Sequence, residues 1–104
     1  MPLNPRPKKW ISGKSVLEKA RKCLESEDVI FSSHLKDRML ERNFNMQDVI
    51  NVIENGDIPR RPEWNEELGQ FRYVVEGKDL EGEELKLVIT LSDKRDAIII
   101  ITGF

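Results

Sequence analysis

The chain of 104 residues is long enough for one domain with its own hydrophobic core, without a metal or a disulfide framework to stabilise it. Its net charge of −2 argues against a protein that binds polyanions regardless of their sequence. The single cysteine, Cys23, excludes an intramolecular disulfide, no signal peptide is recognisable, and the longest apolar run, "AIIII", is too short to cross a bilayer, so we expect a soluble cytoplasmic protein with no membrane association.

We predict an extended, basic arm over residues 1–14. The segment "MPLNPRPKKW" contains three prolines and no hydrophobic periodicity. Residues 1–62 carry a net charge of +3 and residues 63–104 a net charge of −5, so the basic side of the chain lies in its first half. An excess of cations in residues 1–22 can contact RNA phosphates, but it suits a solubilising tail and a surface helix equally well. These cations are Arg6, Lys8, Lys9, Lys14, Lys19, Arg21 and Lys22.

A first amphipathic helix is predicted at residues 15–24. Ser15 and Glu18 have the spacing of a capping box, in which the two residues satisfy free backbone amides at the start of a helix. Apolar residues then recur at helical intervals, at Val16, Leu17, Ala20, Cys23 and Leu24. The run "DVIFS" that follows is rich in β-prone residues and predicts a short strand.

A second short helix is predicted to begin at His34, with Ser33 as its cap, and to end near Asn43. Two of its apolar residues, Leu35 and Met39, should turn toward the core. We also expect Leu40 on that side.

The start of a third helix is marked by a capping pair, Asn45 and Asp48. Phe44 and Val49 occupy the positions of a hydrophobic staple. The dipeptide "NG" at residues 55–56 should end the helix with a residue that tolerates positive φ.

The remaining residues alternate with a period of two, which is typical of strands. We predict strands at "QFRYVVE", "LKLVITL" and "AIIIITGF", the last of which is apolar on both faces and should be central or well covered. The polar segment "EGKDLEGEE" should form a hairpin loop, and residues 92–96 a turn. Pro59 and Pro62 allow at most an edge strand in "DIPRRPEW". We therefore predict one α+β domain at residues 15–104, with N-terminal helices packed on an antiparallel sheet of three to four strands.

The segment "HLKDRMLER" contains one histidine and two arginines at helical spacing. His34, Arg38 and Arg42 are each four residues apart, and because a helix turns about 100° per residue they stay on one flank. An imidazole can accept or release a proton near neutral pH, and a guanidinium offers a planar fork that suits phosphate oxygens. Metal-independent cleavage of RNA needs this combination, because a base must deprotonate the ribose 2′-hydroxyl while cations stabilise charge on the phosphate.

Arg72 is a further candidate for phosphate binding. It projects from a predicted strand on the face opposite Phe71 and Tyr73. Tyr73 can stack on a base if it is exposed, although its apolar neighbours on the same face favour a role in the core.

The same residues are also compatible with an ordinary surface helix that has no catalytic role. His34 in the first turn can serve as a cap, and Arg38 with Asp37 and Glu41 can form a row of surface ion pairs that adds little stability. One histidine and one distant cysteine, without a cluster of carboxylates, argue against a dedicated metal site, and no glycine-rich phosphate loop points to a cofactor.

At "FSSHLKDRMLERNFNMQDVINVIENGDI" the sequence resembles a small bacterial family, the domain-of-unknown-function family 4258. Its pattern is a histidine with arginines four and eight residues later, a short turn, a "DVxxVIxNG" helix, and about three strands. The matching residues are His34, Arg38, Arg42, Asp48, Val49, Val52, Ile53, Asn55 and Gly56. The resemblance covers about residues 29–104 and leaves the arm and the first helix as an extension.

That family is similar in plan to the BrnT and RelE-like toxins of type II toxin–antitoxin modules, small α+β ribonucleases that a partner protein neutralises. The resemblance implies a metal-independent endoribonuclease with His34, Arg38 and Arg42 at shared positions and Arg72 on the first long strand. It further implies RNA and an antitoxin-like protein as partners. The chain departs from such toxins in two features. They are commonly basic, whereas its net charge is −2, and its proline-rich arm has no counterpart in them.

The alternative is a module that binds RNA or a protein partner without catalysis, with a homodimer as one form. The acidic second half of the chain and the hairpin region "GEELK" suggest this reading.

Overall fold

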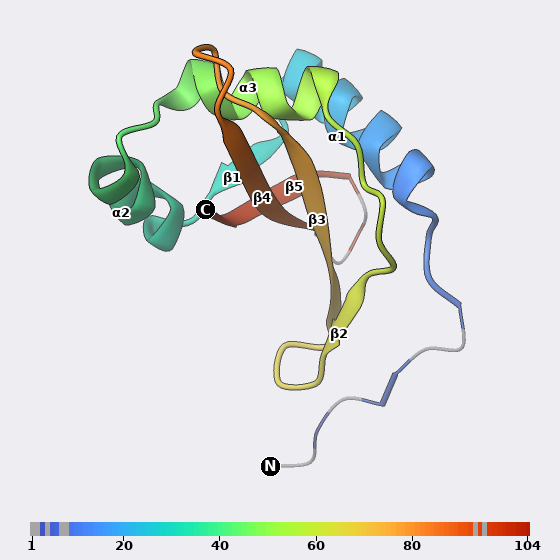
Figure 1. The fold of residues 1–104 in the computed structure, drawn as a ribbon. Helices are drawn as coiled ribbons and strands as arrows, with labels where there is room; N and C mark the ends of the chain where they lie inside the picture. Colours follow the sequence, from blue (N-terminus) through green and yellow to red (C-terminus); the bar gives the residue numbers. More distant parts are fainter. Residues whose placement is uncertain (1–2, 4, 7–8, 93, 95) are drawn as a thin grey trace.

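The computed structural model describes residues 3, 5–6, 9–92, 94 and 96–104 (Figure 1). Within these residues, three helices and five strands follow one another. Their bounds are α1 Gly13–Ser26, β1 Val29–Phe31, α2 Ser33–Arg42, α3 Met46–Asn55, β2 Glu63–Asn65, β3 Gln70–Lys78, β4 Glu84–Leu91 and β5 Ile98–Gly103. The α+β class is therefore confirmed. Part of the predicted arm and of the turn at residues 92–96 lies outside the described residues, namely residues 1–2, 4, 7–8, 93 and 95.

The sheet has five strands, more than the three to four predicted, and it is mixed instead of antiparallel. All five strands form one sheet in the order β1-β5-β4-β3-β2, and β1 runs parallel to β5 while the other pairs are antiparallel. Parallel neighbours need a long crossover connection. Here the chain between β1 and β5, which includes α2 and α3, supplies it, so the sheet is mixed. The hairpin between β3 and β4 and the edge strand β2 after Pro62 agree with the prediction.

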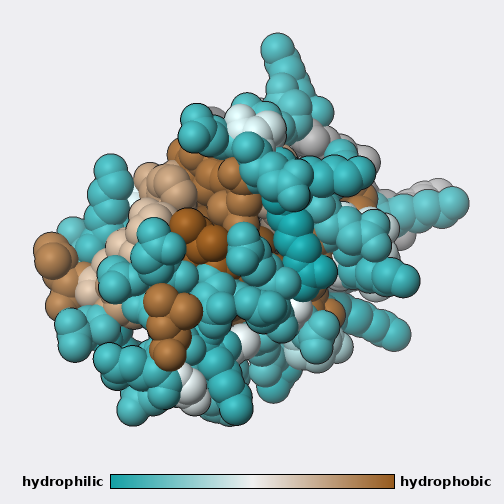
Figure 2. Space-filling model, turned by 90° about the horizontal axis from the view of Figure 1, so that it is seen from above, coloured by the Kyte–Doolittle hydropathy of each residue, from teal (hydrophilic) through white to brown (hydrophobic). Residues whose placement is uncertain are grey.

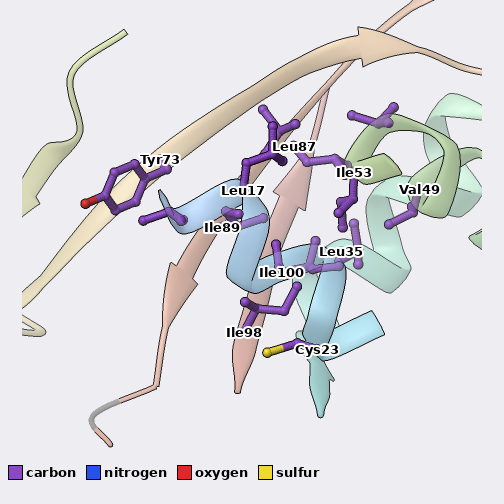
Figure 3. Packing of buried hydrophobic residues seen from close by; sticks show 14 of the residues in the cluster. Leu17, Cys23, Leu35, Val49, Ile53, Tyr73, Leu87, Ile89, Ile98 and Ile100 are labelled. Carbon is purple, nitrogen blue, oxygen red and sulfur yellow. The ribbon is translucent and has the colours of Figure 1, made fainter. Parts of the chain in front are cut away.

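The hydrophobic core lies between one face of the sheet and the helices. In Figure 1, α1 and α3 lie side by side over the sheet, and α2 lies beside the C-terminal end of β5. Figure 3 shows side chains from all three helices pointing toward the strands. They include Leu17, Cys23, Leu35, Val49 and Ile53, which meet Leu87, Ile89, Ile98 and Ile100. Burial of these apolar groups is the main force that holds the helices on the sheet.

The alternate residues of the strands are less covered. Val74, Val88, Ile99 and Ile101 are only partly buried, and Ile30 of β1 is 52% exposed. β5 is thus central, as predicted, but its second face is not fully covered. Seen from above, hydrophilic side chains occupy most of the visible surface, with hydrophobic groups between them (Figure 2). None of the helices in the described part of the chain combines the length and apolar character needed to cross a membrane.

Two helix starts differ from the predicted ones. Ser12, not Ser15, caps α1, because its hydroxyl accepts a hydrogen bond from the Ser15 amide at 3.2 Å. Ser32, not Ser33, caps α2 by accepting from the Leu35 amide at 3.0 Å. The Ser32 hydroxyl also donates to the carbonyl of Ile101 in β5, so a tertiary contact selects this serine over its neighbour.

The side chains of α2 that are buried recur with the helical period, and one of the three predicted core residues is not among them. Leu35 is fully buried and Met39 packs against the core. Leu40, however, is 86% exposed. It lies five residues after Leu35, which is about 140° around the helix, so it points away from the core.

The capping box of α3 is confirmed. The Asn45 side chain accepts from the Asp48 amide at 3.1 Å, and the Asp48 carboxylate accepts from the Asn45 amide at 2.9 Å. Helix α3 ends at Asn55 as predicted, but Gly56 has φ −88° and ψ −174°, an ordinary extended conformation. The expected need for positive φ was wrong.

Arg21 joins α1 to the end of α3. Its Nε donates to the carbonyl of Ile53 at 3.0 Å and its Nη2 to that of Gly56 at 3.1 Å. The last carbonyls of a helix lack partners within the helix and carry partial negative charge, so a guanidinium stabilises them. Of the cations that the sequence offered for RNA contact, Arg21 is therefore engaged within the protein.

Arg21→Met should lower the free energy of unfolding by about 1–3 kcal/mol, because two charge-assisted hydrogen bonds are lost while the apolar stem is kept. Chemical denaturation followed by circular dichroism measures the change. Lys22→Met is the matched control, since Lys22 is the next residue of α1 and is exposed. Equal stability of the two variants would contradict the capping role.

Cys23 is a buried thiol. Burial raises its pKa above the ordinary value of 9.0, and the nearby Asp28 carboxylate raises the pKa further. Because the thiolate is the reactive form, we expect slow reaction with an aromatic disulfide reagent at neutral pH in the native protein and rapid reaction after unfolding. A native rate equal to that of a small free thiol would show that the side chain is accessible.

Candidate functional site

Helix α2 presents the three residues of the predicted row. His34 lies in its first turn, Arg38 in the middle and Arg42 at its end. His34 and Arg42 are exposed, and the Arg38 side chain is 38% exposed. Successive members of the row are displaced by about 40° around the axis, and Leu35 anchors the helix to the core beside them. The structure thus places His34, Arg38 and Arg42 together along one flank that faces solvent.

The contacts of the row are few. Arg38 Nη1 lies 3.6 Å from the Glu41 carboxylate, an exposed pair of the kind that contributes little to stability. Within the described residues, neither His34 nor Arg42 has a hydrogen bond or an ion pair through its side chain. Apart from the weak pair at Arg38, the side chains of the row are therefore available to a ligand.

Arg72 lies elsewhere. It belongs to β3, beside the edge strand β2, where Glu63 is its cross-strand partner. Its Nε is buried and has no hydrogen-bond partner within the described part of the chain. Helix α2 contacts β5, and β4 separates β5 from β3. No described contact brings Arg72 to the row on α2.

A metal site is not apparent among the described residues, in which no group of three histidines, cysteines or carboxylates comes together. The row on α2 contains one imidazole and two guanidinium groups, and guanidinium groups are cations that do not bind metal ions. The chemistry available to the row is proton transfer and stabilisation of negative charge.

A hollow of about 170 Å³ was missed by the sequence analysis. It is lined by aromatic and polar groups from the arm and three strands, among them Lys9, Trp10, Trp64, Gln70, Phe71 and Thr90. Tyr73 lines it too, but this residue is only 3% exposed, in agreement with its predicted place in the core. One sequence signal could have found the hollow: "RPKKW" and "RRPEW" each place an arginine a few residues before a tryptophan.

A family model described as "Domain of unknown function (DUF4258)" matches residues 31–102. The match runs from the end of β1 almost to the end of β5 and includes the whole of α2. Helix α1 and the arm precede it. No curated protein and no solved structure gives a significant match to the chain.

Proposed function

The chain belongs to the DUF4258 family, and from the exposed row on α2 we propose that it is a metal-independent endoribonuclease of the toxin type. The observation that carries this proposal is the common flank of His34, Arg38 and Arg42, which lies within the segment that matches the family. Side chains four residues apart on a helix have Cβ atoms roughly 5–6 Å apart, a spacing that one phosphate group can bridge.

His34 is the acid–base residue of the proposed reaction. As base, its imidazole takes the proton of a ribose 2′-hydroxyl, and the oxygen attacks the adjacent phosphorus. Arg38 and Arg42 bind the non-bridging oxygens and stabilise the charge that develops on them. The bond to the 5′-oxygen then breaks and that oxygen takes a proton, which leaves a 2′,3′-cyclic phosphate and a 5′-hydroxyl. No step needs a metal ion.

Arg72 has an auxiliary role in this proposal. Its position on β3 suits a phosphate of the same RNA strand at some distance from the cleaved bond. Because its Nε is buried, the Arg72 guanidinium would bind such a phosphate through its two Nη groups.

The arrangement of elements supports the relation to the BrnT and RelE-like toxins. A short strand leads into two helices, and a set of antiparallel strands follows. By the same analogy, we propose an antitoxin-like protein as partner, bound over the basic flank of α2.

Binding without catalysis is the second candidate function, and one observation favours it. No described carboxylate or carbonyl accepts a hydrogen bond from His34, so nothing holds its ring in one tautomer or orientation. Catalytic histidines usually have such a partner. In this reading the row docks RNA phosphates or an acidic protein surface, and a homodimer is one form of the module.

Cleavage of a long labelled RNA in the presence of a chelator tests the proposal. We expect the wild type to produce ends with 2′,3′-cyclic phosphate, identified by mass, and His34→Ala to cleave at least 100-fold more slowly, the usual scale of acid–base catalysis. Lys36→Ala is the matched control, because Lys36 is an exposed cation of the same helix outside the row.

Intact RNA at high concentrations of wild-type protein would refute the nuclease. RNA binding that weakens in Arg38→Ala and Arg42→Ala, in the absence of any cleavage, would then support the binding module. Equal cleavage by wild type and His34→Ala would remove His34 from the mechanism.

A further inference from the structure

Three aromatic rings meet where the arm reaches the sheet. Phe71 of β3 lies between Trp64 of β2 and Trp10 of the arm, with ring centroids 4.8 Å and 6.3 Å apart and interplanar angles of 60° and 61°. Edge-to-face rings do not cover one another as stacked rings do. All three line the hollow of about 170 Å³.

Cations surround the same rings. The guanidinium carbon of Arg6 lies 5.7 Å from the Trp10 ring centroid and 6.0 Å from that of Phe71, and Arg61 lies 5.9 Å from Trp10. Lys9 lines the hollow itself. In the part of the chain that the structure describes, none of these three cations has an ion pair, so each can bind an anion.

The size and polarity of the hollow limit the kinds of ligand that it can bind. A cavity of about 150 Å³ holds a benzene ring, so the hollow, at about 170 Å³, has room for one six-membered ring. Its lining also includes Gln70, whose side-chain amide can donate to and accept from the edge of a base. A purely apolar ligand would leave this amide and the cations unused. A planar, polar ring attached to phosphate uses all of them.

We propose that this hollow binds one unpaired base of a single-stranded RNA, with Trp10, Trp64 and Phe71 in contact with the base and Arg6, Lys9 and Arg61 at the adjoining phosphates. Aromatic side chains beside a cationic groove are the usual means of holding single strands without strict sequence preference. The inference rests on the proposed function in that both take RNA as the ligand. It adds a second RNA site, away from α2.

The arm completes this site. The Tyr73 hydroxyl donates to the carbonyl of Ile11 and so fixes the chain just after Trp10. Arg6, Lys9 and Trp10 all precede the segment that matches the family model, whereas Trp64 and Phe71 lie within it. The base site therefore combines residues of the N-terminal extension with residues of the segment that matches the family.

Intrinsic fluorescence gives a direct test, because the only two tryptophans of the chain both line the hollow. The probe is a short 2′-O-methyl oligouridylate, which lacks the attacking hydroxyl and cannot be cleaved by the proposed reaction. We expect saturable quenching in the wild type. Arg6→Ser with Arg61→Ser should weaken binding about tenfold or more, since two phosphate contacts are removed while both tryptophans remain. Leu40→Ala, which alters an exposed residue of α2, is the control and should bind as the wild type does.

Trp10→Ala tests the contact with the base. Fluorescence anisotropy of a labelled oligouridylate should show binding weakened about 5- to 100-fold, the range for loss of one aromatic stacking partner. Circular dichroism verifies that the variant is folded. Uridine monophosphate serves as the second probe, and it should bind more weakly than the oligonucleotide because it lacks the adjoining phosphates.

The outcomes separate the two proposals. If the oligonucleotide quenches the fluorescence but the long labelled RNA stays intact in the cleavage assay, the base site is supported and the nuclease is refuted. Absence of saturable quenching, or unchanged binding in both the double arginine variant and Trp10→Ala, would overturn the base site even if RNA is cleaved at α2. Equal affinity for uridine monophosphate and the oligonucleotide would overturn the assignment to an RNA strand and identify a free nucleotide as the ligand.

Discussion

Asp48→Ala is expected to lower the free energy of unfolding by about 2–4 kcal/mol, a large share of the stability of a small domain. The Asp48 side chain makes two connections. One oxygen accepts from the Asn45 amide at the start of α3 and the other from the Leu80 amide in the β3–β4 hairpin, both at 2.9 Å. Its negative charge at a helix N-terminus adds a favourable interaction with the helix dipole.

The size of this effect follows from burial. Asp48 is 8% exposed, so its truncation leaves polar groups without a partner in a region that water enters poorly. Asp48→Asn keeps the shape and one acceptor oxygen but loses the charge, and its stability should fall between those of the wild type and Asp48→Ala. Glu54→Ala, at an exposed position near the other end of α3, should change stability by less than about 0.5 kcal/mol. Denaturant titration measures all three, and an Asp48→Ala protein as stable as the Glu54→Ala control would refute this account.

Gly56→Ala should destabilise the protein by about 2–4 kcal/mol or prevent folding, because no space exists for a β-carbon. A Cβ at Gly56 would lie 2.5 Å from the Val52 carbonyl oxygen and 2.6 Å from that of Glu76. Both contacts are with backbone, and the Glu76 carbonyl also accepts from the Asp57 amide at 2.9 Å. Neither atom can move without disturbing the end of α3 or the strand β3.

Gly82→Ala separates this steric cause from a conformational one. Gly82 has φ +87° in the β3–β4 hairpin, and a Cβ there would meet nothing within 4 Å. Its substitution should cost about 1 kcal/mol through backbone strain alone. A smaller loss for Gly56→Ala than for Gly82→Ala, measured by thermal unfolding, would show that α3 and β3 can separate without much cost.

Local features of the fold were predictable because both partners of each interaction are close in the chain. The capping box of Asn45 and Asp48 lies within four residues, and the alternation in "LKLVITL" is a property of one strand. Neighbouring serines, in contrast, have equal local merit as caps. The choice of Ser32 depends on Ile101, which is 69 residues away.

The candidate row was predictable for the same reason. The period of the α-helix alone places His34, Arg38 and Arg42 on one flank of α2. The sequence indicated that Leu35 and Met39 face the core, but the exposure of His34 depends on how α2 packs beside β5. The separation of Arg72 from the row depends on the order of the strands, which no local pattern contains.

The sequence by itself determined the α+β class, most of the helices and strands, and the presence of one histidine and two arginines on one flank of a helix, because these follow from short periodicities. Only the tertiary structure decided the parallel pairing of β1 with β5, the use of Arg21 as an internal cap and the meeting of Trp10, Trp64 and Phe71. Each of these joins residues from segments well separated along the chain. Their proximity comes from the packing of the whole core, so a pattern read over a few residues does not reveal it.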